Sequence, residues 1–346
     1  MPRSRPRRNT SSQSPAGARF GREVPLLQVR LGFVAMSLSL EAASPSRATT
    51  LARLRQGGRE QAMRRLTHIA AQNIESTLRI VRHAAAEGIP LYRFSSRLIP
   101  FLGHPETRDW DFFRYLATDF ALLGAAVRTA GLRTSFHPEH AAVVLSADHP
   151  DVQEATRQTL LDHARICELM GLPGAMLVVH VGGGYGDKAA ALSRFRAAAA
   201  ALPPAVRGRL AVENDDRTFS VRDALEAAGE AGLPVVLDAL HHRCNPCAGS
   251  LEELVGEAFG TWRDRDLPPK LHLSSARDQR SPRGHADYVR VEDALALLEA
   301  ARPHGRDIDV MLEAKAKDLA VRELVEALSR EPGVQRTGGG TIRYRP

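Results

Sequence analysis

The stretch Leu177-Val178-Val179-His180 is an apolar run that ends in a metal-ligand side chain. Two later stretches, Leu210-Ala211-Val212-Glu213 and Val235-Val236-Leu237-Asp238, have the same form and end in a carboxylate. Other strand-like runs carry ligands at or near their ends in the same way: His137, His272 and Glu313, with His241 shortly after Asp238. Because such groups are costly to bury unless they are paired or bound to metal, this pattern predicts a shared metal site where the strands end.

Eight apolar runs of strand length alternate with amphipathic segments rich in alanine and leucine. Strands are expected at residues 29–36, 90–96, 133–138, 175–182, 209–215, 234–240, 270–276 and 309–315. Helices are expected at 51–87, 110–130, 151–171, 187–201, 221–232, 251–259, 290–301 and 317–329. Eight such alternations with near-continuous apolar strands predict a parallel sheet closed into a (β/α)8 TIM barrel. The active site of this fold lies at the C-terminal ends of the strands, where the ligands stand.

The chain is expected to hold one large domain between two short ends. Residues 1–28 are predicted to be a disordered basic arm, because the first 26 residues contain six arginines and one glutamate. The barrel is assigned to 29–330, a length that α/β barrels commonly occupy as a single unit. Residues 331–346, with the glycine run at 338–340, are predicted to be a loose tail.

Composition excludes several classes of protein. No apolar run is long enough to span a membrane, and the arginine-rich start lacks the apolar core of a secretory signal. Three cysteines are too few for a disulfide framework, so we expect a reducing, cytoplasmic compartment. We also expect a monomer that does not bind membranes. The Cys244-Asn245-Pro246-Cys247 pair has no second pair to complete a zinc site, and we interpret it as a loop with incidental cysteines.

The ligand set at the strand ends is too large for one metal ion. Four histidines and three carboxylates exceed the three or four protein ligands of a tetrahedral zinc, so two or three divalent ions are predicted, with Glu213 as a bridge. Imidazole and carboxylate without thiolate suit Mn²⁺ or Zn²⁺, and Mg²⁺ less well. His104 and His285 are further candidates. Such clusters serve in-line displacement at phosphorus, although sugar isomerisation through an enediolate remains an alternative.

Lysine is scarce in this chain, with four residues among 47 basic ones. Lys270 stands two residues before His272 in a predicted strand, so both side chains face the same side. Arginine cannot be deprotonated in proteins, whereas a buried lysine can. Lys270 is therefore predicted to serve chemistry that requires an amine.

Longer motifs occur in one order along the chain: Arg93-Phe94-Ser95-Ser96-Arg97, His180-Val181-Gly182-Gly183-Gly184-Tyr185-Gly186-Asp187-Lys188, Asp238-Ala239-Leu240-His241-His242 and Glu313-Ala314-Lys315. In this combination, over about residues 29–318, the chain resembles the UV damage endonucleases (UvdE/UvsE). The resemblance implies a barrel related to the AP endonuclease IV superfamily. It also implies ATP-independent incision of duplex DNA on the 5′ side of a UV photoproduct, leaving 3′-hydroxyl and 5′-phosphate ends.

The resemblance further implies roles for individual residues. About three divalent metals, typically Mn²⁺, are expected on His104, His137, His180, Glu213, Asp238, His241, His272, His285 and Glu313. Catalysis is expected to involve Glu213, His272 and Lys270, the last either carboxylated or as a plain cation at the scissile phosphate. Contacts with the damaged double-stranded DNA are expected at Phe33, Ser37, Arg93, His140, Tyr185 and Lys188.

The chain departs from the family pattern in three places, one of them a pair of residues. A Gln-Tyr pair that wedges into the helix opposite the lesion is replaced by His140-Ala141, and losing a stacking aromatic removes on the order of 1–3 kcal/mol. Ser37 replaces an asparagine, and Phe33 replaces a tyrosine. The lesion range is therefore open. Two alternatives stand beside the endonuclease, a sugar isomerase or epimerase on the same barrel and a non-catalytic metal-binding DNA scaffold.

Overall fold

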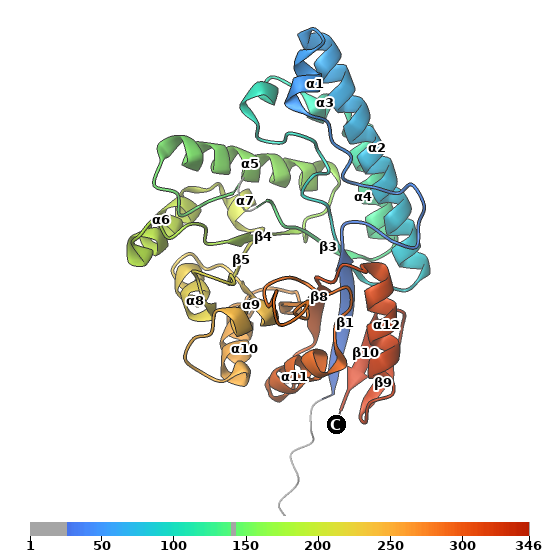
Figure 1. The fold of residues 1–346 in the computed structure, drawn as a ribbon, viewed down its shortest axis with the longest axis vertical. Coiled ribbons are helices and arrows are strands. Elements are labelled where there is room, and N and C mark those ends of the chain that lie inside the picture. The colour runs from blue at the N-terminus through green and yellow to red at the C-terminus, as the bar shows by residue number, and fades with distance from the viewer. Residues whose placement is uncertain (1–25, 140–142, 346) are drawn as a thin grey trace, which may run out of the picture.

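Eight parallel strands close into a barrel in the computed structural model, which describes residues 26–139 and 143–345 (Figure 1). The strands are β1 (Leu27–Val34), β2 (Leu91–Arg93), β3 (Arg133–Phe136), β4 (Met176–His180), β5 (Leu210–Glu213), β6 (Val235–Asp238), β7 (Lys270–Leu273) and β8 (Ile308–Leu312). Strand β1 pairs in parallel with both β2 and β8, which closes the sheet. The predicted (β/α)8 TIM barrel is confirmed.

Helices surround the barrel and connect its strands (Figure 1). They are α1 (Leu51–Arg55), α2 (Arg59–Ala86), α3 (Phe112–Tyr115), α4 (Ala117–Thr129), α5 (Pro150–Leu169), α6 (Lys188–Ala201), α7 (Pro204–Arg207), α8 (Val221–Gly229), α9 (Ala239–Cys244), α10 (Leu251–Gly260), α11 (Val291–Ala301) and α12 (Asp318–Leu328), with short 3₁₀ turns η1 (Pro105–Thr107) and η2 (Arg302–His304). Ser250 and Glu253 form a capping box at the start of α10, which satisfies backbone N–H groups that the helix leaves unpaired.

The apolar core has two parts, one on each side of the sheet. The larger part lies between the sheet and the helices. The smaller part fills the barrel interior and consists of Met176, Val178, Ala211, Val236 and Trp262. Because alternate residues of a strand face the same side, the residue two positions after each of these strand residues also points inward. The apolar interior therefore carries the strand-end ligands above it, at the C-terminal mouth.

A buried charge cluster lies at the opposite, N-terminal end of the barrel interior. Asp309, in β8, is fully buried and accepts hydrogen bonds from Arg30 Nε and Nη2 at 2.6 and 2.9 Å. It also pairs with Arg133, whose guanidinium lies 5.4 Å from the centre of the Trp262 ring. Two arginines thus satisfy this carboxylate. The sequence analysis did not identify this cluster.

The C-terminal segment is ordered, and the expectation of a loose tail at 331–346 is wrong. Strands β9 (Val334–Arg336) and β10 (Thr341–Tyr344) form a hairpin, and β10 extends the sheet antiparallel to β1. Ile342 and Tyr344 are buried against the barrel. The glycine run permits close packing, since a Cβ at Gly339 would lie 1.6 Å from the Glu87 carbonyl oxygen. The short alternating strand after the glycines was the available signal.

The expectations about membrane-spanning segments and disulfides can be compared with the described residues. Helices within 26–139 and 143–345 are too short or too polar to cross a membrane. Cys167, Cys244 and Cys247 are all free thiols. Residues 1–25 of the predicted arm, and the His140-Ala141 pair, lie outside the described residues.

Candidate metal centre

Six of the predicted ligands meet at the mouth of the barrel. His137, His180 and Glu213 form one group, and Glu213 forms a second with three further residues, Asp238, His272 and Glu313. Within each group the ligand atoms lie within 4.8 Å of one another. These residues stand at or just after the ends of β3, β4, β5, β6, β7 and β8. Closure of the barrel, and nothing in the local sequence, brings them together.

Glu213 lies at the centre of both groups. Its Oε2 is 2.7 Å from His137 Nε2, and its Oε1 is 2.8 Å from His272 Nδ1. His180 Nε2 is 3.7 Å from Oε2. Full burial alone would raise the pKa of Glu213, but the imidazolium groups of His272 and His180 outweigh it and hold that pKa well below its usual range. A carboxylate that presents both oxygens to separate histidines has the arrangement that a bridging ligand needs.

Two polar atoms of the second group lack hydrogen-bond partners. Asp238 Oδ2 and His272 Nε2 are buried and find no donor or acceptor among the described residues. Buried polar atoms in folded proteins are almost always satisfied, so each exception requires an explanation. A divalent cation is a partner that an acceptor-only carboxylate oxygen and an imidazole lone pair can share. The donor set of imidazole and carboxylate, without thiolate, fits Mn²⁺ or Zn²⁺.

Asn214 holds two of the ligands in place. Its Oδ1 accepts from Asp238 N at 2.9 Å, and its Nδ2 donates to Asp238 O at 3.1 Å. His241 Nδ1 lies 3.0 Å from the Asn214 carbonyl oxygen, which can only accept. Nδ1 of His241 therefore carries a proton, and Nε2 is the atom that could bind a metal once it loses its own proton, the usual arrangement of a metal-bound histidine. Asn214 was not among the predicted site residues, although a polar residue directly after a strand-end ligand is a usable signal.

The cluster is strongly protonated when it holds no metal. Burial opposes the charged form of His272, but Glu213 and Glu313 raise its pKa to about 9. His241 behaves in the same way, because Asp238 and Glu213 overcome burial and raise its pKa to about 9. Burial raises the pKa of Asp238. Metal binding at this mouth would therefore displace protons.

His241 and His285 lie at the edge of the two groups. The ring centres of these two histidines are 6.3 Å apart. His285 Nδ1 is 3.8 Å from Glu313 Oε2, and His241 Nδ1 is 3.7 Å from Glu213 Oε1. Both histidines therefore adjoin the cluster without belonging to either group. Their predicted place among the ligands stays a prediction.

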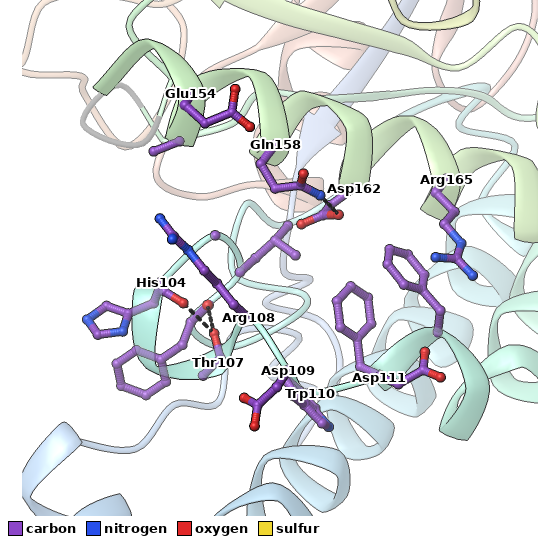
Figure 2. A pocket seen from close by; sticks show the side chains of 16 residues that line it. His104, Thr107, Arg108, Asp109, Trp110, Asp111, Glu154, Gln158, Asp162 and Arg165 are labelled. Atoms are coloured by element: carbon purple, nitrogen blue, oxygen red, sulfur yellow. Dashed lines mark hydrogen bonds between the residues drawn. The ribbon is translucent and has the colours of Figure 1, made fainter. Parts of the chain in front are cut away.

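His104 is the predicted ligand that the structure does not bring to these groups. It caps η1 through its Nδ1, which accepts from Glu106 N at 3.1 Å, and packs edge-on against Phe101. Figure 2 shows it at the edge of a pocket of about 470 Å³ between this segment and α5. The position of a residue in this long connection depends on how the connection folds, which strand spacing does not determine. Its role as a ligand also stays a prediction.

Two cationic residues adjoin the cluster: Lys270, deeper in the barrel interior, and Arg93, next to Glu313. Lys270 is fully buried, and its Nζ donates to Ser135 Oγ at 3.1 Å. Burial, reinforced by the charge of Arg133, lowers the pKa of Lys270 to about 7. Arg93 forms an ion pair with Glu313. The amine is thus titratable near neutral pH, as the scarcity argument anticipated, while its catalytic role is untested.

The predicted DNA contacts divide by exposure. Phe33 is fully buried and packs edge-on against Tyr92, and Ser37 is buried with its Oγ 2.6 Å from Asp318 Oδ2. Burial leaves neither residue available to touch DNA in this conformation. Tyr185 is 48% exposed, whereas Lys188 forms an ion pair of 2.6 Å with Asp223.

Fold and site together define a (β/α)8 barrel with a candidate divalent-metal centre at its C-terminal mouth. Comparison with known proteins identifies the family. The model of the UV-endonuclease UvdE family matches residues 29–345. The chain belongs to this family.

Individual relatives agree with this assignment. A UV DNA damage endonuclease from Bacillus pumilus is 38% identical over 322 residues, which is 92% of this chain and 100% of the relative. The crystal structure of SacUVDE is 26% identical with a TM-score of 0.77 and covers 87% of this chain and 98% of its own. Endonuclease IV from Thermus thermophilus, at 18% identity and a TM-score of 0.52, covers 87% of this chain and 100% of its own and shares the fold. The predicted class, a DNA repair endonuclease, is confirmed at the level of the family.

Proposed function

We propose that this chain is a metal-dependent endonuclease that nicks duplex DNA on the 5′ side of UV photoproducts or related lesions, leaving 3′-hydroxyl and 5′-phosphate ends. The observation that carries the proposal is the unmet bonding of Asp238 Oδ2 and His272 Nε2 within a buried group of four ligands. The metal-ligand chemistry suits displacement at phosphorus. Family membership supports DNA as the substrate.

We propose that two or three divalent ions, with Mn²⁺ expected, are held at the mouth. The two groups that share Glu213 would each hold one ion. His241 and His285, which adjoin these groups, would complete the set, and His104, which lies apart from them, stays a predicted ligand. Bound there, such ions supply Lewis-acid stabilisation of phosphate charge and an activated water. Asn214 orients Asp238 and His241 toward this position through both of its side-chain atoms and its carbonyl.

The chain's own cations would act on the phosphate. Arg93, paired with Glu313, lies at the mouth, where its guanidinium is placed to meet negative charge that enters. Lys270 lies one inward position below His272 with a pKa of about 7, so its neutral amine is populated near neutral pH. That neutral amine is the form that carboxylation requires, and the protonated form would serve as a cation. An intact-mass measurement of the native protein distinguishes a carboxylated Lys270 from an unmodified one.

DNA would lie across the mouth of the barrel. The exposed ring of Tyr185 is the described aromatic that we assign to a DNA contact, and Lys188 would exchange Asp223 for a phosphate. Flipping of damaged nucleotides out of the stack would bring the phosphate to the metal centre. We propose further that the protein is cytoplasmic, since three free thiols suit a reducing compartment, and that it acts as a monomer.

Incision of a labelled duplex tests the proposal. The duplex carries one cyclobutane pyrimidine dimer and is incubated with Mn²⁺ or with EDTA, beside undamaged and abasic duplexes. We expect a nick directly 5′ to the dimer that EDTA abolishes. A nick only at the abasic site would keep the metal-dependent nuclease and overturn the lesion assignment. Failure to cut any duplex would favour the sugar isomerase or the non-catalytic scaffold.

A further inference from the structure

Lys317 holds a backbone conformation that suits glycine better than lysine. Its φ of 56° and ψ of −122° match the first central position of a type II′ turn, where glycine dominates. A non-glycine residue in such a region costs on the order of 1–3 kcal/mol and persists where the surroundings enforce it. Strain of this kind is found most often at functional sites. The question is therefore what the lysine side chain does there.

Contacts on both sides of Lys317 fix it in this conformation. On one side, Ala316 N donates to the carbonyl oxygen of Asp287 at 2.9 Å. On the other side, the buried carboxylate of Asp318 accepts from Ser37 Oγ at 2.6 Å and Leu38 N at 2.8 Å, and lies 3.2 Å from His83 Nε2. These anchors explain how the strained turn survives. Glycine would satisfy the same anchors without the strain, so they do not explain the lysine.

Lys317 lies at the mouth of the barrel, because its turn follows β8 directly and is held by Lys315 N and Ala316 N to the carbonyl oxygens of Ala286 and Asp287, next to His285. Burial lowers the pKa of Lys317 most, the charge of Arg93 lowers it further and the charge of Glu313 raises it, so the ammonium lies within electrostatic range of both groups. Glu313 is the ligand that borders His272, at 3.1 Å, and pairs with Arg93. Within the described residues the Lys317 ammonium makes no hydrogen bond or ion pair of its own. Lys317 is thus a partly buried cation without a hydrogen-bond or ion-pair partner in the described part of the chain, near a predicted metal ligand that Arg93 already pairs.

We propose that Lys317 is a catalytic residue whose ammonium donates a hydrogen bond to a non-bridging oxygen of the scissile phosphodiester at the Glu313 side of the metal centre. This inference rests on the proposed endonuclease function. A half-buried, unpaired ammonium has three donors to offer, and a phosphate oxygen is the ligand that a metal-adjacent cation can bind without competing for the metal. The strained turn fixes the backbone position from which this side chain starts.

Lys317→Gly, Lys317→Met and Lys315→Met separate the proposed role from a structural one. Lys315 is exposed, lies two residues away in the same segment and serves as the matched control. In single-turnover incision of the dimer duplex with Mn²⁺, we expect both Lys317 variants to lose on the order of 100-fold in rate, as for removal of an oxyanion donor, and Lys315→Met to remain within about twofold. Lys317→Gly should at the same time raise the melting temperature, because it releases the strain. Butylammonium should restore part of the rate of Lys317→Gly and none of that of Lys317→Met.

Unchanged incision in both Lys317 variants, with active wild type, would overturn the inference and leave the proposed function intact. A rate loss that coincides with a lower melting temperature in Lys317→Gly, and that butylammonium does not rescue, would also overturn it. An inactive wild type would refute the proposed function instead. The salt dependence of duplex binding, measured with Ca²⁺, then still decides on the phosphate contact. Its log–log slope should shrink by about one in Lys317→Met and stay unchanged if Lys317 touches no phosphate.

Discussion

The two ends of the barrel interior both bury carboxylates, and they satisfy them in opposite ways. At the N-terminal end, Asp309 receives hydrogen bonds from Arg30 and an ion pair from Arg133, so both of its oxygens have protein partners. At the C-terminal mouth, Asp238 Oδ2 has no partner among the described residues. The Asp309 carboxylate is thus fully satisfied by protein groups and the Asp238 carboxylate is not, although Arg133 Nε and Nη2 also lack partners among the described residues. An unsatisfied carboxylate oxygen and imidazole nitrogen that converge can bind a cation, whereas the guanidinium nitrogens of Arg133 are donors only and cannot.

The two ends also differ in the residue type that surrounds the buried carboxylate. Arginine is abundant in this protein, and the N-terminal end uses it to neutralise its carboxylate. The mouth instead gathers histidines around Glu213. Unlike arginine, a histidine can lose its proton, and the negative charge of Glu213 is then available to a metal cation. Breaking a buried ion pair lowers the stability of the fold, whereas a cluster with unsatisfied ligands is stabilised mainly when a metal ion binds. Substitutions at the two ends should therefore affect different properties.

Glu213→Gln should give the largest effect, because it removes the carboxylate that both ligand groups share. We expect the rate of Mn²⁺-dependent incision to fall by on the order of 1,000-fold, which corresponds to the several kcal/mol that metal ions contribute. Affinity for damaged duplex should change little. Single-turnover kinetics and fluorescence anisotropy measure the two quantities. Retention of incision within tenfold would mean that the mouth is not the catalytic centre.

Asp309→Asn should affect stability and leave the metal site alone. It leaves Arg133 buried beside Lys270 without its counter-charge, and breaking a buried pair in this way costs about 3–5 kcal/mol. Urea unfolding of the metal-free protein measures the loss. Mn²⁺ affinity of the folded variant should stay within a few-fold of wild type. A variant with normal stability and lost metal binding would reverse the roles that we assign to the two ends.

Metal binding should become tighter as the pH rises from 6 toward 9. His241 and His272 have a pKa of about 9 in the metal-free protein, above the ordinary 6.5, so they are protonated in this window and the ion must displace protons. Each displaced proton makes the affinity rise about tenfold per pH unit. In the metal-free protein the same shifts stabilise the fold below pH 6.5, and this contribution is lost as the pH rises through 9.

Calorimetry at about pH 7.5 in buffers of different ionisation enthalpy counts the protons released. We expect about one or more per bound ion. A pH-independent affinity with no proton release would show that the ion binds away from these histidines.

Replacing Cys244 and Cys247 with serine should have the smallest effect. Neither thiol belongs to the two ligand groups, and Cys244 Sγ only approaches the Pro282 carbonyl oxygen at 3.5 Å. Metal content and incision rate should remain within about twofold of wild type. Elemental analysis of the purified double variant measures the first quantity. Loss of an ion in this variant would extend the metal site beyond the histidines and carboxylates.

The sequence predicted the elements whose positions follow from strand period and barrel closure. Glu213, Asp238 and His272 stand at strand ends, and eight parallel strands bring such ends to one mouth whatever the loops do. The positions of residues in long connections were harder to predict, because they depend on contacts with residues that are remote in sequence. His104 caps a turn beside α5, and Ser37 is drawn inward by Asp318, which lies 281 residues away. The C-terminal hairpin escaped prediction because its partner strand is β1, at the other end of the chain.

Anomalous diffraction at the manganese edge, from crystals soaked in Mn²⁺, tests the central claim most directly. The account predicts peaks at the mouth, bounded by Glu213, with one in contact with Asp238 Oδ2 and His272, and none beside Asp309. Crystals with saturating Mn²⁺ in which Glu213 remains paired only with His137 and His272, with no peak at the mouth, would contradict it.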